Sequence, residues 1–339
     1  MSLKNLWRWL VGGAVFAVAI YYAHRHDVAH PRITLDDTIP EHQAFVLTVD
    51  ADRFRGDPVF ASLETPPSLV TRMSPCGFDV STRVHRVIFI VPEGEEKDGS
   101  FALAATLNVS QAEIEACGKV LKGSTAVLDR NFYVSKQDER SLAYRPISAS
   151  EGLVLFGDSG VVATMLDAAQ GTRPRLGSQS GHAEVRRALG ESKGGVVLSA
   201  VLPKSVRDRL RKEIGENETQ MAAILTVELA GVALAPDGKG GIVLDGTFLC
   251  DSKGDATNVR EWADRQLARV KRDIGLKLLL GGTLDGLALQ VTDKRVLANV
   301  SVSHEILERV YAFMLAQAGE RNAQKKPETG GGGPPGFSP

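Results

Sequence analysis

The sequence predicts an α+β protein: an N-terminal transmembrane helix followed by a tandemly duplicated, mostly antiparallel β-sheet unit with helices on one face. Three observations support this fold class. A long apolar run covers residues 6–23. Two stretches of β-strand composition are interrupted by a turn of Pro, an acidic residue and Gly, at residues 92–94 and 236–238. Each hairpin-like stretch is followed by a helical pattern and further strands, so we expect the same unit twice.

The first element is the apolar run of residues 6–23, which has the length of a transmembrane anchor, because roughly 20 apolar residues cross a bilayer. Aromatic side chains lie at both ends, as in the belts at membrane interfaces: Trp7, Trp9, Tyr21 and Tyr22. The run therefore predicts that the membrane itself is a partner of this chain.

The orientation of this anchor follows from its basic residues. Lys4 and Arg8 favour a cytoplasmic location for residues 1–5, which places the main domain in the periplasm or outside the cell. A signal peptide with a cleavage site at residues 17–19 is the alternative. An uncleaved anchor is favoured because the apolar run continues through Tyr22.

The rest of the chain divides by composition and by repeats. We expect a juxtamembrane linker over residues 24–43, a first α+β repeat over 44–180 and a second over 190–318. Residues 319–339 are rich in Gly and Pro, bury little apolar surface and are expected to be a disordered tail.

Both repeats are expected to follow the order strand, helix, hairpin, helix, further strands and helix. In the first repeat these elements are expected at residues 44–50, 57–64, 86–107, 110–121, 126–134, 142–146, 153–156 and 160–169. In the second they are expected at residues 195–203, 205–214, 231–249, 255–275, 287–292, 296–302 and 304–316. Ser110 with Glu113 is typical of a capping box, and Ile274 is expected on the buried apolar face of the helix at 255–275.

One short motif indicates chemistry. The segment "LVLFGDSGVV" at residues 153–162 contains Gly-Asp-Ser-Gly around Ser159, and its "FGDSG" resembles the nucleophile block of GDSL-type (SGNH) esterases. The resemblance implies that Ser159 is a nucleophile with a histidine base that follows an aspartate by three residues. His182 and His304 follow Gln179 and Ser301 at that spacing, so the sequence departs from the family pattern. The same tetrapeptide occurs around the reactive serine of chymotrypsin-like proteases, although here Val161 and Val162 replace their Gly-Pro.

A structural interpretation explains the same residues. The segment 153–156 is a strand, Asp158 or Ser159 caps the next helix, and Gly171 ends it. The second repeat has Ser303 where the first has Ser159, without the Gly-Asp-Ser-Gly sequence. This comparison favours a capping role for Ser159.

The three cysteines predict one disulfide. Cys76 and Cys117 both lie in the first repeat and would pair in an oxidising compartment, whereas Cys250 is expected to be a buried free thiol. Three buried free thiols are the alternative.

Composition excludes some classes of protein. Lys and Arg number 40 against 41 Asp and Glu, so the chain lacks the basic surface of a nucleic-acid-binding protein. The histidines at positions 24, 26 and 30 are better explained as a polar flank of the anchor than as metal ligands, and no motif predicts a cofactor. The basic helix at 205–214 is expected to expose its Arg and Lys side chains to solvent; contact with an anionic membrane is the alternative.

Together these features predict a membrane-anchored extracytoplasmic protein with a non-catalytic binding, scaffolding or envelope-assembly role and a protein partner in the envelope. An exported serine hydrolase using Ser159 is the alternative.

Overall fold

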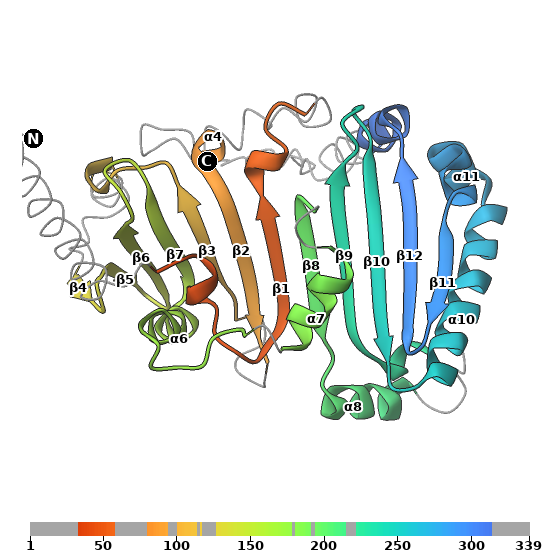
Figure 1. The fold of residues 1–339 in the computed structure, drawn as a ribbon, viewed down its shortest axis with the longest axis horizontal. Helices are drawn as coiled ribbons and strands as arrows, with labels where there is room; N and C mark the ends of the chain where they lie inside the picture. Colours follow the sequence, from red (N-terminus) through yellow and green to blue (C-terminus); the bar gives the residue numbers. More distant parts are fainter. Residues whose placement is uncertain are drawn as a thin grey trace, which may run out of the picture. The chain divides into compact units, whose positions relative to one another are not determined.

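The computed structural model describes residues 33–57, 80–93, 100–113, 116, 127–177, 180–190, 194–214 and 222–313 (Figure 1). The predicted anchor and the predicted tail lie outside these residues. Within the described part, no helix is both long and apolar enough to span a membrane. The fold is mixed α+β with extensive antiparallel sheet, which confirms the predicted class. The chain forms two compact units: Met1–Gln43 with Pro67–Ser180, and Ala44–Pro66 with Gly181–Pro339.

Unit 1 contains antiparallel strands in the order β2-β3-β7-β6-β5-β4. The strands are β2 (Val84–Pro92), β3 (Ala102–Leu107), β4 (Val127–Asp129), β5 (Phe132–Gln137), β6 (Arg140–Pro146) and β7 (Gly152–Asp158). The helical elements are η1 (Asp36–Thr38), α4 (Val80–Arg83) and α6 (Ser159–Gln170). Strand β7 is apolar and buried over most of its length, as expected for a central strand covered on both faces.

The core of unit 1 lies under α6. Val161, Val162, Met165 and Leu166 are all buried, and the helix contacts β6, β7 and η1. Gly171 ends α6 in the left-handed region with φ 74°, so the predicted stop is confirmed. A second cluster of buried residues is centred on Tyr144, whose hydroxyl donates to the carbonyl of Val109 at 3.2 Å.

Unit 2 contains antiparallel strands in the order β1-β8-β9-β10-β12-β11. The strands are β1 (Gln43–Asp50), β8 (Val196–Val201), β9 (Val227–Pro236), β10 (Ile242–Cys250), β11 (Ala288–Thr292) and β12 (Arg295–Val302). The helical elements are η2 (Ala51–Arg53), α7 (Gly181–Ala188), α8 (Lys204–Ile214), η4 (Ile224–Thr226), α10 (Lys253–Arg272), α11 (Ile274–Leu280) and η5 (Gly281–Asp285). A final helix is described over residues 304–313.

Helices α7 and α10 cover the same face of the sheet in unit 2. Leu229 and Ala233 of β9 are buried under α7, and Val227 of the same strand is buried against α10. These residues are an even number of positions apart, so their side chains lie on one face of the strand. Gly231 lies between them, and a Cβ there would come within 2.1 Å of the Val185 side chain on α7.

Strand β1 belongs to unit 2, although we expected it to open the first repeat. It pairs with β8 from Phe45 opposite Ala200 to Val49 opposite Val196. Arg186 of α7 also donates a hydrogen bond to the Thr48 hydroxyl of β1. Residues far apart in the sequence thus complete one sheet.

Four strands of each unit share one topology. Unit 1 contains β2-β3-β7-β6 and unit 2 contains β9-β10-β12-β11, each with a hairpin followed by a crossover that places the last strand beside the second. A helix with the same type of N-terminal cap follows each hairpin. Ser110 and Glu113 make the predicted capping box, in which the Ser110 amide donates to Glu113 at 2.9 Å, and Ser252 accepts from the Asp255 amide at 3.1 Å.

Two predicted elements were wrong. The single strand expected at 126–134 is a hairpin, because Arg130 and Asn131 adopt positive φ of 51° and 63°, the two-residue turn that joins β4 to β5. The single helix expected at 255–275 ends at Arg272, and a separate helix, α11, follows Asp273. Helix α7 has no counterpart among the predicted elements.

Candidate functional site

Ser159 is the first residue of α6, and its contacts are structural. Its hydroxyl lies 2.8 Å from the Ser141 hydroxyl on β6, and its amide donates to the carbonyl of Glu139 at 2.8 Å. A nucleophilic serine requires a base that takes its proton. In the described part of the chain, the hydroxyl contact of Ser159 is another hydroxyl and not an imidazole.

The neighbours of Ser159 join β7 to the strands beside it. A Cβ on Gly157 would lie 2.4 Å from the Phe101 carbonyl oxygen, so only glycine allows this approach. Asp158 is the N-cap of α6 by position, but its carboxylate accepts from the Phe101 amide at 2.8 Å and makes no capping hydrogen bond. The predicted capping hydrogen bond is therefore wrong. Ser303 precedes the final helix as Asp158 precedes α6, so it is equivalent to Asp158 and not to Ser159.

A serine–histidine pair lies in unit 2 and was missed by sequence reasoning. His182 Nδ1 is 2.9 Å from the Ser199 hydroxyl. Ser199 is fully buried and His182 is 3% exposed, so no substrate reaches this pair. The contact ties α7 to β8 inside the core of unit 2.

Only one of the three cysteines lies among the described residues. Cys76 and Cys117 lie outside the described residues, so their disulfide stays a prediction. Cys250 is a buried free thiol, as expected. Burial, followed by the charges of Asp255 and Asp251, raises the pKa of this thiol to about 11, which keeps it protonated and unreactive at neutral pH. Among the described side chains, no group of His, Cys, Asp and Glu is arranged to hold a metal ion.

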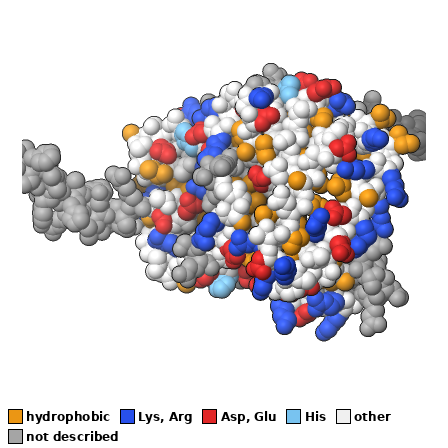
Figure 2. All heavy atoms as spheres, turned by 45° about the vertical axis from the view of Figure 1, so that its right-hand side comes forward, with side chains coloured by type: hydrophobic (Ala, Val, Ile, Leu, Met, Phe, Trp, Pro, Cys, Tyr) orange, Lys and Arg blue, Asp and Glu red, His pale blue; other side chains and the backbone are white. Residues whose placement is uncertain are grey.

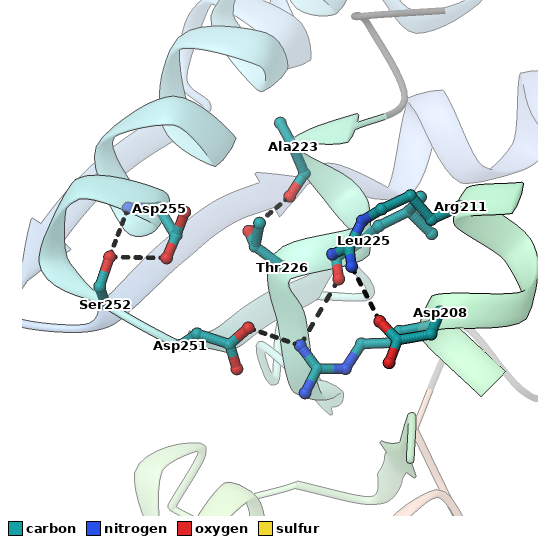
Figure 3. Close-up of polar contacts among 9 residues, drawn as sticks. Asp208, Arg211, Ala223, Leu225, Thr226, Asp251, Ser252 and Asp255 are labelled. Carbon is teal, nitrogen blue, oxygen red and sulfur yellow. Dashed lines mark hydrogen bonds and ion pairs between the residues drawn. The ribbon is translucent and has the colours of Figure 1, made fainter. Parts of the chain in front are cut away.

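The basic helix α8 does not expose all of its cations. The Arg207 side chain is only 7% exposed, and its Nη1 contacts Asp251 at 2.7 Å and the Leu225 carbonyl at 3.5 Å (Figure 3). This ion pair holds α8 against the segment between β10 and α10. The expectation that Arg207 lies on a solvated face is therefore wrong, because the half-buried Asp251 offers it a carboxylate on the domain side.

Among the described residues, the most exposed large apolar side chains of unit 2 lie on α11. Asp273 separates α10 from α11 and caps α11, because its carboxylate accepts a hydrogen bond from the Leu276 amide at 3.0 Å. Every residue from 272 to 278 is exposed. Ile274, which we expected to be buried, is 76% exposed, and Leu278 on the same helix face is 71% exposed. Complete burial of such a side chain contributes about 1.5–3 kcal/mol, so leaving two in water is costly.

A hollow lies beside these side chains, between α11 and the final helix. Its volume is about 460 Å³, and its walls are mainly apolar. The lining residues are Asp273, Gly275, Leu276, Leu278, Leu279, Arg309 and Phe313. Arg309 lies at the edge of the hollow, where it donates to the Leu278 carbonyl at 3.1 Å. We call Ile274, Leu276, Leu278 and Phe313 the α11 surface.

Cationic side chains surround the α11 surface. Figure 2, which brings α10 and α11 forward, shows Lys and Arg side chains along this side of the chain with exposed hydrophobic side chains beside them. Several of these cations have carboxylate partners: Arg260, Arg265, Lys271 and Arg309. Among the described residues, Arg269, Arg272 and Lys277 have no such partner, and these three cations outnumber the carboxylate of Asp273 beside them.

Comparison with known proteins gives only distant similarity. No protein family and no curated protein matches this chain. Crystal form I of TP0453 is similar with a TM-score of 0.46 and 9% identity, over 83% of this chain and 98% of that one. Crystal form III of TP0453 has a TM-score of 0.45 and 10% identity, over 82% and 97%. The double ringed trimeric shell protein MSM0271 from the RMM microcompartment has a TM-score of 0.12 and 13% identity, over 70% and 87%. Similarities this distant say nothing about function.

Proposed function

We propose that this chain is a membrane-anchored extracytoplasmic protein whose folded part has a non-catalytic binding, scaffolding or assembly role in the cell envelope. The observation that carries the proposal is the α11 surface, where aliphatic side chains and unpaired cations are exposed together. Exposed apolar surface of this kind typically marks an interaction site.

The sequence supports the anchored part of this proposal. Residues 6–23 are apolar with aromatic residues at both ends, and Lys4 and Arg8 favour a cytoplasmic start of the chain. The domain that follows would then lie in the periplasm or outside the cell, where the Cys76–Cys117 disulfide would form.

The non-catalytic part of the proposal is supported by the contacts of Ser159. Its hydroxyl contacts Ser141, and the Gly157–Asp158 segment before it is used to join β7 to Phe101. Gly157, Asp158 and Ser159 thus each have a structural role that requires no chemistry.

We also infer that the two units derive from a tandem duplication. Their shared four-strand order and the equivalent caps at Ser110 and Ser252 support a common ancestral unit. The membership of β1 in unit 2 differs from the simple end-to-end arrangement of repeats.

One experiment on the native membrane tests location and chemistry together. Protease added outside intact spheroplasts is expected to digest the folded part, while alkaline carbonate leaves the chain in the membrane fraction. A fluorophosphonate probe applied to the same membranes is expected to leave the chain unlabelled. Ser159→Ala provides the matched control for that probe.

Two results would contradict the proposal. Release of the chain from the membrane by carbonate would show that the chain has no transmembrane anchor. Fluorophosphonate labelling that disappears in Ser159→Ala would establish the serine hydrolase instead.

A further inference from the structure

We propose that the α11 surface binds the surface of an anionic lipid bilayer. The inference rests on the proposed function, because an anchored domain stays close to the membrane. It adds the identity of the partner: the lipid surface itself, and not a second protein.

The apolar part of the argument is the form of the exposed segment. Ile274 and Leu278 are one helical turn apart, and both residues have more than two thirds of their surface in water, at 76% and 71%. They are flexible aliphatic side chains on a short helix that is exposed over its first five residues. Interfacial segments of membrane-binding proteins insert side chains of this kind below the headgroups.

The charged part of the argument selects anionic lipids. Arg272 and Lys277 flank Ile274, Arg269 lies one turn before Arg272 on α10, and none of the three contacts a carboxylate among the described residues. Each such cation gains favourable energy near a negatively charged leaflet. The nearest acidic side chain, Asp273, keeps its negative charge while it accepts the Leu276 amide, so three cations without a carboxylate partner lie beside one carboxylate in this segment.

The residue types favour lipid over a protein partner. Energetically important protein interfaces are enriched in Trp and Tyr anchors that fill pockets. The α11 surface presents Ile, Leu and a single Phe313, and it leaves its adjoining hollow open. A fluid acyl region accepts such a surface without a matching shape.

Hydrogen exchange of the full chain tests the proposal. The chain is placed in nanodiscs of phosphatidylcholine, with or without 30% phosphatidylglycerol, and exchange is followed by mass spectrometry. We expect the amides of residues 274–280 to exchange at least tenfold more slowly in the anionic discs than in the neutral ones. High salt should remove most of this difference, because it screens the cations.

Two variants separate membrane contact from a change in folding. Ile274→Asp with Leu278→Asp should abolish the slowing, because the variant cannot bury these side chains. Val127→Asp with Leu128→Asp alters an apolar pair on β4 of unit 1 that is similarly exposed, at 65% and 64%. This control variant should show the same slowing of exchange at residues 274–280 as the unaltered chain. Exchange in β9 and β10 reports whether each variant is folded.

Several outcomes would overturn the inference. Exchange that is no slower in either kind of disc than in the Ile274→Asp, Leu278→Asp variant would exclude the lipid surface as partner. Slowing of the same size in neutral and anionic discs would show that the α11 surface does not require anionic lipid. Slowing that requires an added envelope protein would assign the α11 surface to that protein. Retention in the discs tests the anchor separately. A chain that is not retained is mixed with vesicles of the two compositions, and the same amides are measured.

Discussion

Arg207 and Arg211 lie one turn apart on α8, but their ion pairs have different surroundings. Arg207 is buried and contacts Asp251, whereas Arg211 and its partner Asp208 are both about half exposed. An exposed pair contributes little, because water and salt screen it. A buried guanidinium that loses its carboxylate keeps the cost of its desolvation.

We therefore expect Asp251→Asn to lower the free energy of unfolding by about 2 kcal/mol, the range for a charged group left without its partner. Urea denaturation monitored by circular dichroism measures this change. Asp208→Asn, on the exposed pair of the same helix, should change the free energy by less than about 0.5 kcal/mol. Equal effects of the two variants would show that the burial of Arg207 does not determine the strength of its pair.

Single residues show where sequence reasoning succeeds and where it fails. Gly171 was predicted to end α6 because a glycine after an apolar helix adopts the left-handed conformation, and it does. The burial of Arg207 was not predictable, because its partner Asp251 is 44 positions away. The role of Ser159 was only partly predictable: its position at a helix start is local, but its Ser141 contact depends on how β6 pairs with β7.

At the scale of elements, the capping box at Ser110 has a defined pH dependence. The Ser110 amide, then the Arg83 guanidinium and the Ser110 hydroxyl, lower the pKa of Glu113 from 4.5 to about 2. A carboxyl group with a lowered pKa stabilises the folded state above its unfolded pKa and loses this contribution as the pH falls towards the folded value. The window for Glu113 is therefore from about pH 4.5 down to about pH 2.

Glu113→Gln should lower the melting temperature at pH 7, because glutamine is a weaker acceptor for the Ser110 amide and Arg83. The difference from the wild type should shrink below pH 4.5 and vanish near pH 2. Differential scanning calorimetry across this range measures it. Glu228→Gln, at an exposed position on β9, should leave the melting temperature nearly unchanged at every pH. A difference for Glu113→Gln that stays constant with pH would contradict the capping interpretation.

Elements with clear local signals were predicted well, and breaks within them were not. The hairpin of β9 and β10 follows the Pro-Asp-Gly signal, and Asp237 stabilises its turn by accepting from the Lys239 and Gly241 amides. Asp273 interrupts a continuous helical pattern, so only its capping contact in the folded chain reveals α11. The α11 surface was therefore missed, because the helical pattern alone placed Ile274 in the core.

At the scale of the whole molecule, the sheet of unit 2 includes β1, which is far in the sequence from the other strands of that unit. Without β1, the hydrogen-bonding edge of β8 would be open, and an open edge favours aggregation. We expect a fragment of residues 181–313 to fold only when a peptide of residues 43–57 is added. Anisotropy of the labelled peptide measures binding. Val46→Asp in the peptide should prevent it, because Val46 is fully buried in the complete chain.

A fragment that reaches the same stability without the peptide would show that β1 is dispensable. The membership of β1 in unit 2 could not be predicted from the sequence, because its alternating pattern fits a place beside any strand with a buried face. The repeat boundaries at residues 44–180 and 190–318 stay a prediction.

The pairing of β1 with β8 also affects when the protein can fold. Ala200 is synthesised roughly 8–30 s after its partner Phe45, at ribosomal rates of about 5–20 residues per second. During that interval β1 is without β8, the strand that joins it to the rest of unit 2. Unit 2 therefore cannot fold completely from one continuous segment of the chain. We expect the nascent chain to depend on a holding chaperone until β8 has been made.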